Sequence, residues 1–174
     1  MSKMLGLGYP VDRALQRTAE KGDSNAVNFP IAQLKSKYDF SFSGLKTSVL
    51  RYLQKKYGPE FTNIPQDELP DIAASFQKAA VDSLMQKVVI AVNEFDVKSL
   101  SLVGGVAANQ KLQNSFRKVS DQYKLKLVIP DLEFCGDNAA MIAMRGLMLN
   151  NSNKKFDLSE NAFASLSNEM FLRA

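Results

Sequence analysis

The clearest pattern along the chain is a stripe of apolar residues at every fourth position between Asp71 and Phe95. The stripe consists of Ile72, Phe76, Ala80, Leu84, Val88 and Val92, and it is widened by Ala73, Ala79, Val81, Met85 and Val89. A four-residue repeat keeps apolar side chains on one face of an α-helix. The segment is therefore predicted to be a long helix that packs on a sheet or on other helices.

Shorter elements are predicted on both sides of this helix. Helices are expected over 11–21, 45–57, about 109–123 and from Asp137 or Asn138 to about Leu149, and alternating polar and apolar positions predict strands over 39–44, 99–103 and 125–129. Helices that alternate with strands are typical of an α/β fold with a parallel sheet. We expect one domain over residues 1–150, followed by a loose tail over 151–174.

The sheet predicted in this way is small. Only two of its strands are clear, whereas a parallel sheet usually has more strands and is covered on both faces. We therefore expect the chain to be truncated, so that it is either cut from a larger protein or completed by a partner.

Composition narrows the class of protein. Hydrophobic residues make up 45% of the 174 residues, which is ordinary for a globular protein with a core. No apolar run approaches the ~20 residues of a membrane helix, and the N-terminus has no secretory apolar region. The single cysteine, Cys135, excludes an internal disulfide and is expected to be a small buried residue. We expect a cytoplasmic protein with no membrane partner.

The positive charge is unevenly distributed. The net charge is +4, and the segment between Phe29 and Gly58 contains one acid, Asp39, beside the basic residues Lys35, Lys37, Lys46, Arg51, Lys55 and Lys56. Two interpretations stay open: a solvated helix face, or a patch that binds RNA phosphates.

Histidine is absent from the chain. This excludes nucleophilic catalysis of the Ser-His-Asp or Cys-His kind and removes the commonest metal ligand. Any catalysis would use carboxylates, lysine, backbone amides or residues of another chain.

A pair of glycines, Gly104 and Gly105, joins the strand predicted over 99–103 to the following helix. Glycines let a ligand approach the backbone, and the carboxyl ends of strands are where open α/β sheets bind ligands. Asn109 stands where its amide can bind a base or ribose. The alternative is a plain turn in which Asn109 only caps the helix.

Asp137 follows the strand predicted over 125–129, in the string Phe134-Cys135-Gly136-Asp137-Asn138-Ala139-Ala140-Met141-Ile142-Ala143. A carboxylate there faces the same side of the sheet as Asn109 and can bind a cation. The alternative is that Asp137 is a helix N-cap.

Ser43-Gly44 is interpreted as a strand-to-helix corner. Lys46 and Thr47 beyond it can reach a phosphate, but the spacing of a P-loop is missing.

Taken together, these motifs resemble one family. Tyr9-Pro10, Phe40-Ser41-Phe42-Ser43-Gly44-Leu45-Lys46-Thr47, Gly104-Gly105-Val106-Ala107-Ala108-Asn109 and the string around Asp137 occur in the order found in the tRNA N6-adenosine threonylcarbamoyltransferases, also called glycoprotease-like or O-sialoglycoprotein endopeptidase-like proteins. The resemblance runs from about Leu5 to Leu147.

The resemblance implies a fold and an activity. It implies the C-terminal lobe of an actin/Hsp70/sugar-kinase-like (ribonuclease H-like) fold with a helical insertion. It also implies a transferase that moves a threonylcarbamoyl group from threonylcarbamoyl-adenylate to N6 of adenosine 37, in tRNAs that read codons beginning with A. The implied partners are tRNA, threonylcarbamoyl-adenylate, the missing N-terminal lobe and other subunits of the threonylcarbamoyladenosine pathway.

The resemblance also implies site residues. Asp137 matches the family's metal ligand for one divalent ion, iron or zinc, Asn109 matches the residue that binds the adenylate nucleoside, and Gly104 and Gly105 match the glycines beside it. Asp12 falls where a substrate-contacting glycine usually stands. No general acid or base is implied.

The departures from the family matter as well. The family's two metal-binding histidines have no counterpart here, and Val11-Asp12 replaces the usual glycines. We therefore expect this chain alone to be inactive and not to retain the metal. Two alternatives remain, a non-catalytic partner or scaffold subunit of the same pathway and an ATP-binding relative of the sugar-kinase type.

Overall fold

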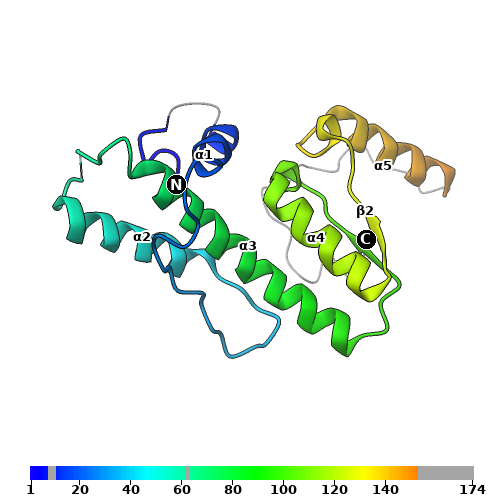
Figure 1. Ribbon diagram of the computed structural model, residues 1–174. Coiled ribbons are helices and arrows are strands. Elements are labelled where there is room, and N and C mark those ends of the chain that lie inside the picture. Colours follow the sequence, from blue (N-terminus) through cyan, green and yellow to red (C-terminus); the bar gives the residue numbers. More distant parts are fainter. Residues whose placement is uncertain (8–10, 62, 153–174) are drawn as a thin grey trace. The chain divides into compact units, whose positions relative to one another are not determined.

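The computed structural model describes residues 1–7, 11–61 and 63–152, except for the side chains of residues 11–13. The chain divides into two compact units, residues 1–136 and 137–174. The first unit contains most of the regular structure (Figure 1), in the order α1 (Val11–Ala19), α2 (Phe42–Tyr57), α3 (Leu69–Glu94), β1 (Ser99–Ser101), α4 (Gln110–Tyr123) and β2 (Lys126–Val128). The second unit contains α5 (Ala139–Asn151).

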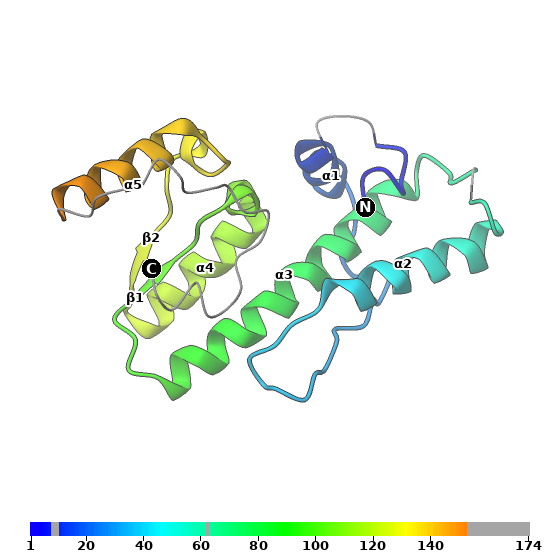
Figure 2. The same cartoon turned by 180° about the vertical axis from the view of Figure 1, so that it is seen from behind.

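The long helix α3 contributes residues to both hydrophobic cores of the first unit. Pro70 stands in its first turn, where a missing N–H costs nothing, and Asp71 there complements the positive end of the helix dipole. The helix ends at Phe95, which is extended (φ −114°, ψ 145°). Figure 2 shows α3 running past α1 and α2 and then alongside α4.

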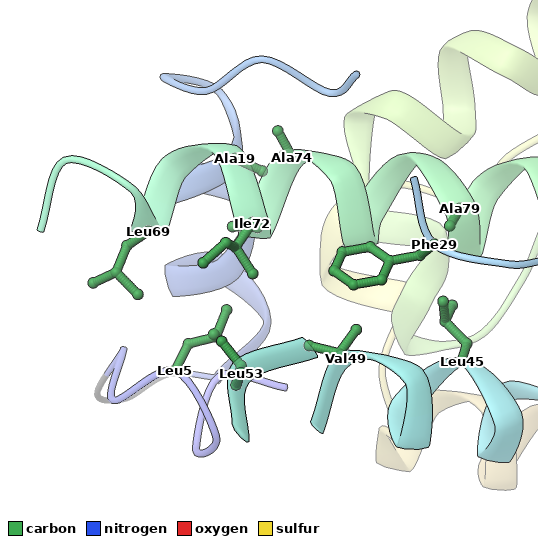
Figure 3. Packing of buried hydrophobic residues seen from close by; sticks show 11 residues of the cluster. Leu5, Ala19, Phe29, Leu45, Val49, Leu53, Leu69, Ile72, Ala74 and Ala79 are labelled. Atoms are coloured by element: carbon green, nitrogen blue, oxygen red, sulfur yellow. The ribbon is translucent and has the colours of Figure 1, made fainter. Parts of the chain in front are cut away.

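The N-terminal half of α3 forms one hydrophobic core with α1 and α2. In Figure 3, Leu45, Val49 and Leu53 of α2 point toward α3, with Leu53 on the side of Leu69 and Ile72 and Leu45 on the side of Ala79. Val49, Leu53 and Ile72 are at most 1% exposed. The remaining buried members of this cluster are Leu5, Ala19, Phe29, Ala73, Ala74 and Ala79.

The C-terminal half of α3 forms a second core with α4 and the sheet. Its buried members are Val81, Leu102, Ala107, Leu112, Phe116 and Cys135. The sheet consists of β1 and β2, which pair in parallel with Leu100 opposite Leu127. The Leu102 N–H donates to the Val128 carbonyl (3.0 Å) and so continues the ladder by one residue. The predicted parallel α/β arrangement is confirmed as this small sheet among helices.

The segment after α1 is fixed to the start of α3. The Asp23 N–H donates to the Asp71 carboxylate (2.7 Å), and the Val27 N–H donates to the Ser75 hydroxyl (3.1 Å). Gly22 packs so closely here that a Cβ would lie 2.1 Å from the Pro70 carbonyl carbon. Only glycine fits this crossing without displacing backbone.

The strand predicted over residues 39–44 is wrong. Helix α2 already begins at Phe42, so Ser43 and Gly44 lie in its first turn and form no strand-to-helix corner. Ser41 is extended (φ −141°, ψ 126°), but as the residue preceding a helix. The alternation came from Phe40 and Phe42, whose rings contact each other (centroids 5.6 Å apart) where the chain enters the helix.

The remaining predicted elements are confirmed, with ends shifted by a few residues. Cys135 is buried as expected, and its thiol donates to the Pro130 carbonyl (3.5 Å). The division at residue 150 stays a prediction. Among the residues described, no helix has both the length and the apolar composition that a membrane crossing requires.

Helix α5 is apolar yet contains no buried residue. Five of its large side chains are 49–66% exposed, namely Met141, Ile142, Met144, Leu147 and Met148. An apolar helix usually packs against further structure.

We predict that Gly22→Ala destabilises the first unit, because the added methyl meets the backbone of Pro70. Overpacking of this kind costs about 1–3 kcal/mol. The matched control is Gly44→Ala, since a Cβ at Gly44 meets nothing within 4 Å and α2 should gain up to about 1 kcal/mol. Urea denaturation of both variants tests the pair, and equal stability of the two would contradict the close packing at Gly22.

Glu68 connects the end of α2 to the start of α3. Its carboxylate accepts from Lys56 and from the Tyr57 hydroxyl (2.6 Å), and these bonds lower the pKa of Glu68, with Lys56 contributing most. Burial, together with the bond to Glu68, raises the pKa of Tyr57 to about 12.

We predict that Glu68→Gln lowers the melting temperature slightly at pH 7. A lowered folded pKa stabilises the fold above the unfolded value, about 4.3, and this stabilisation disappears as the pH falls through the folded pKa. The difference from the parent chain should therefore vanish at acid pH. Glu60→Gln, at an exposed position, is the control that should change nothing at either pH.

Candidate functional site

The turn after β1 exposes the backbone of both predicted glycines. Gly104 has φ +89°, a value that side chains rarely allow, and Gly105 begins the short 3₁₀ turn η1 (Gly105–Ala108). A Cβ at either glycine would meet nothing within 4 Å, so the space beside them is open. A ligand can approach this backbone closely.

Asn109 is the N-cap of α4. Its side-chain oxygen accepts from the Leu112 N–H (3.0 Å) and from the Gln77 amide of α3 (3.3 Å). The helix-cap interpretation is therefore confirmed for the oxygen. The side-chain NH₂ group has no partner among the residues described, and Asn109 is partly exposed.

A buried glutamine holds the turn in place. The Gln113 amide donates to the Ala107 carbonyl (2.8 Å), and the Gln113 oxygen accepts from Arg117 (3.1 Å). Gln113 is 6% exposed, so these bonds satisfy a polar group that would otherwise be costly to bury. The position of Asn109 thus depends on α3 and α4 together.

A polar pocket lies beside Asn109, with a volume of about 440 Å³. Gln16 of α1 and Glu20, the residue after α1, line the pocket together with Lys111 and Lys118 of α4. Gln77 also lines it, so one α3 side chain contacts both Asn109 and the pocket. The lining is largely polar, and the pocket is open to solvent.

Sequence reasoning did not identify Gln16 and Gln77 as parts of this region. The Gln16 oxygen accepts from the Gln110 N–H (3.4 Å), across 94 residues of sequence. Neither glutamine belongs to a local motif, so no spacing along the chain indicates either of them.

Asp137 belongs to the second unit, where it directly precedes the N-cap of α5. That cap is Asn138, whose side-chain oxygen accepts from the Met141 N–H (3.0 Å). The alternative that Asp137 is the cap is therefore wrong. Its carboxylate is exposed, and within the described part of the chain it makes no hydrogen bond or ion pair.

Two predictions about the site stay open. The shared crevice of Asn109 and Asp137 stays a prediction, because the two residues belong to different units. The side chain of Asp12 lies outside the described residues, although its backbone belongs to α1. The parallel pairing of β1 and β2 does place the carboxyl ends of both strands at one edge of the sheet.

Comparison with known proteins gives a consistent result. A family model described as tRNA N6-adenosine threonylcarbamoyltransferase matches residues 1–144. A relative of that name from Thermosipho africanus is 47% identical over 150 residues, which cover 86% of this chain and 44% of the relative. Relatives of the same name from Chlorobium phaeobacteroides and Symbiobacterium thermophilum are 46% and 39% identical, and the matches cover 43% and 47% of their lengths and 84% and 95% of this chain. The chain spans less than half the length of these relatives.

We predict that Asn109→Ala costs about 1 kcal/mol of stability through loss of the cap. Asn109→Asp is the matched variant, because it keeps an oxygen for the Leu112 N–H and replaces the NH₂ donor with a second, negatively charged oxygen, which an N-cap position accommodates. Its stability should equal that of the parent chain. Chemical denaturation checks both variants, and an Asn109→Asp chain as unstable as Asn109→Ala would contradict the cap.

Proposed function

The chain belongs to the tRNA N6-adenosine threonylcarbamoyltransferase family, and from this premise we propose that it supplies one wall of the site that transfers a threonylcarbamoyl group to N6 of adenosine 37 in tRNA. The observation that carries the proposal is the family match over residues 1–144, which includes the Gly104–Asn109 turn and Asp137. It favours the transferase over an ATP-binding sugar kinase.

The proposed fold is the C-terminal lobe of an actin/Hsp70/sugar-kinase-like protein, located in the cytoplasm. The parallel pair β1 and β2 and the exposed apolar side chains of α5 support this proposal, since both are suited to further packing. More than half the length of the Thermosipho africanus relative has no counterpart in this sequence. We propose that such residues form the second lobe and the other wall of the cleft.

The metal implied by the family requires ligands beyond this chain. Among the residues described, no group of three or more histidine, cysteine, aspartate or glutamate residues is placed to hold an ion, and the sequence has no histidine. The residues present therefore do not fit a complete iron or zinc site. In the proposed protein, Asp137 supplies a single carboxylate ligand, for which its exposed position is suited.

The reaction requires mainly positioning from this chain. In threonylcarbamoyl-adenylate the carbamoyl carbon is bonded to a phosphate oxygen of AMP. Attack by N6 of adenosine 37 forms the new C–N bond, the C–O bond to AMP breaks, and a proton leaves N6. Because AMP is a ready leaving group, holding the acyl carbon near the amine provides much of the acceleration. The open backbone at Gly104 and Gly105 and the Asn109 amide are proposed to hold the adenylate.

A second candidate is a non-catalytic partner subunit of the same pathway. The absence of histidine, together with Val11-Asp12 in place of the usual glycines, favours this candidate. Both candidates require other residues for turnover, but only the transferase requires Asp137 and Asn109 in a shared site.

We predict that the chain alone shows no threonylcarbamoyl transfer, and that adding the preceding region of the Thermosipho africanus relative, in cis or in trans, restores it. In the restored enzyme, Asp137→Ala should lose metal retention and turnover without loss of stability, because Asp137 caps no helix. Asn109→Asp should weaken adenylate binding and spare the metal. Transfer to tRNA, metal content and denaturation are measured for each.

The control is Asp131→Ala, an exposed carboxylate in the preceding loop whose side chain makes no cap bond. It should leave activity and metal content unchanged. Full activity of Asp137→Ala would contradict the site assignment. Turnover by the unsupplemented chain would contradict the need for a second wall.

A further inference from the structure

Helix α3 buries a glutamine on a side where its other residues are apolar. Gln77 is 8% exposed. Ala73, Ala74 and Val81 stand three or four residues away from it and so share its side of the helix, and they are at most 6% exposed. An apolar side chain would fill this place at lower cost, because a buried amide gives up its hydrogen bonds with water. We therefore expect Gln77 to have a role beyond packing.

The hydrogen bond of Gln77 indicates that role. Its Nε2 donates to Asn109 Oδ1 (3.3 Å), across 32 residues of sequence. Within the described part of the chain, this is the only hydrogen bond that the Gln77 side chain makes. The buried amide is thus directed at one residue, and that residue belongs to the candidate site.

Two buried glutamines hold different parts of the same turn. Gln113 of α4 donates to the Ala107 carbonyl (2.8 Å) and so fixes the backbone that leads to Asn109. The Leu112 N–H holds the Asn109 side-chain oxygen at the start of α4. Gln77 adds a second donor to that oxygen from another helix. A single bond would leave the amide free to pivot about its oxygen, whereas two donors on different elements restrict this rotation.

We propose that Gln77 is a positioning residue of the adenylate site, which fixes the Asn109 side-chain amide so that its NH₂ group is held ready for the nucleotide. The proposal rests on the proposed function for the identity of the ligand. Gln77 acts through Asn109 and makes no contact with the nucleotide. A side chain that is already held in its binding conformation loses less entropy when the ligand arrives, so the bond contributes to affinity.

The first test is the NMR spectrum of the full 174-residue chain. Gln77→Met removes the donor and keeps a long, unbranched side chain in the core. The substitution should shift the side-chain NH₂ signals of Asn109 and increase their motion, while the Leu112 N–H stays protected from exchange because the cap bond survives. Unchanged Asn109 signals in the folded variant would overturn the proposal.

The parent chain allows a measurement that needs no variant. Because the two side chains are in hydrogen-bond contact, a nuclear Overhauser effect is expected between the side-chain amide protons of Gln77 and the side chain of Asn109. Its absence would contradict the bond, even if Gln77→Met failed to fold.

The second test is a double-mutant cycle with AMP, the nucleotide part of the proposed substrate. Gln77 also lines the polar pocket, so a direct contact with the ligand must be separated from positioning. Gln77→Met should weaken AMP binding on the order of 2- to 10-fold, which corresponds to one neutral hydrogen bond. In a chain that already carries Asn109→Ala, the same substitution should change the affinity little. An equal loss on both backgrounds would mean that Gln77 contacts AMP itself, and the proposal would be wrong.

Ser75→Ala is the matched control. Ser75 is also buried on α3 (2% exposed), and its hydroxyl donates to the Asp23 carbonyl (3.3 Å) and accepts from the Val27 N–H (3.1 Å). Loss of these bonds should lower the melting temperature and leave the Asn109 signals and the affinity for AMP at parental values. A loss of AMP affinity as large as that of Gln77→Met would assign the effect to general loosening of α3 and would contradict positioning.

The outcomes separate this proposal from the proposed function. If AMP binds to the parent chain and the Asn109 signals do not depend on Gln77, the proposed function stands and the positioning role is wrong. If the parent chain does not bind AMP at millimolar concentration, the adenylate site proposed for this chain is contradicted, and Gln77 only supports the helix cap.

Discussion

Burial of the apolar stripes on α3 is the interaction on which the rest of the first unit depends. Ile72 and its neighbours bury against α1 and α2, and Val81 and Leu84 bury against α4 and the sheet. One continuous helix therefore serves two cores. Gln77 stands where the helix passes from the first core to the second, and from there it contacts both Asn109 and the polar pocket. The geometry of the candidate site is thus set by a helix that carries no site motif of its own.

Helices α3 and α4 could be predicted from the sequence, because apolar residues recur at helical spacing along their whole length and every one of them indicates a helix. The short alternation over residues 39–44 could not be interpreted correctly, since whether Phe40 and Phe42 belong to a strand depends on a partner strand that local sequence does not reveal. Asp137 and Asn138 are adjacent, and both are residue types that cap helices. Only the exact residue at which α5 begins shows that Asn138 is the cap, and the sequence does not define that residue. Gln16 and Gln77 contact the site region through residues that are distant in the sequence. Such contacts depend on the fold and leave no pattern in the local sequence. The site residues themselves came from the family resemblance, because the pattern alone favoured capping for both Asn109 and Asp137.

In the second unit, helix α5 forms although its apolar side chains are not buried. Helix α5 has a cap of its own at Asn138, so its start is specified locally. Its methionines, leucine and isoleucine nevertheless remain exposed. Most helical stability in proteins comes from tertiary packing of an apolar face, and this helix lacks such packing among the residues described. The match covers 44% of the Thermosipho africanus relative.

The cap at Asn109 also restricts what the residue can recognise. Its oxygen is occupied by the Leu112 N–H and the Gln77 amide, so the side chain retains only donor capacity. Any ligand atom that meets it must be a lone-pair acceptor, such as a ring nitrogen of a purine or a hydroxyl oxygen. An exocyclic amine, being a donor, would be repelled at that point. If the amide meets the Watson–Crick edge of a base, it can donate to N1 of adenine, which is an acceptor, but not to N1 of guanine, which carries a hydrogen. The residue that caps the helix would then select adenine over guanine.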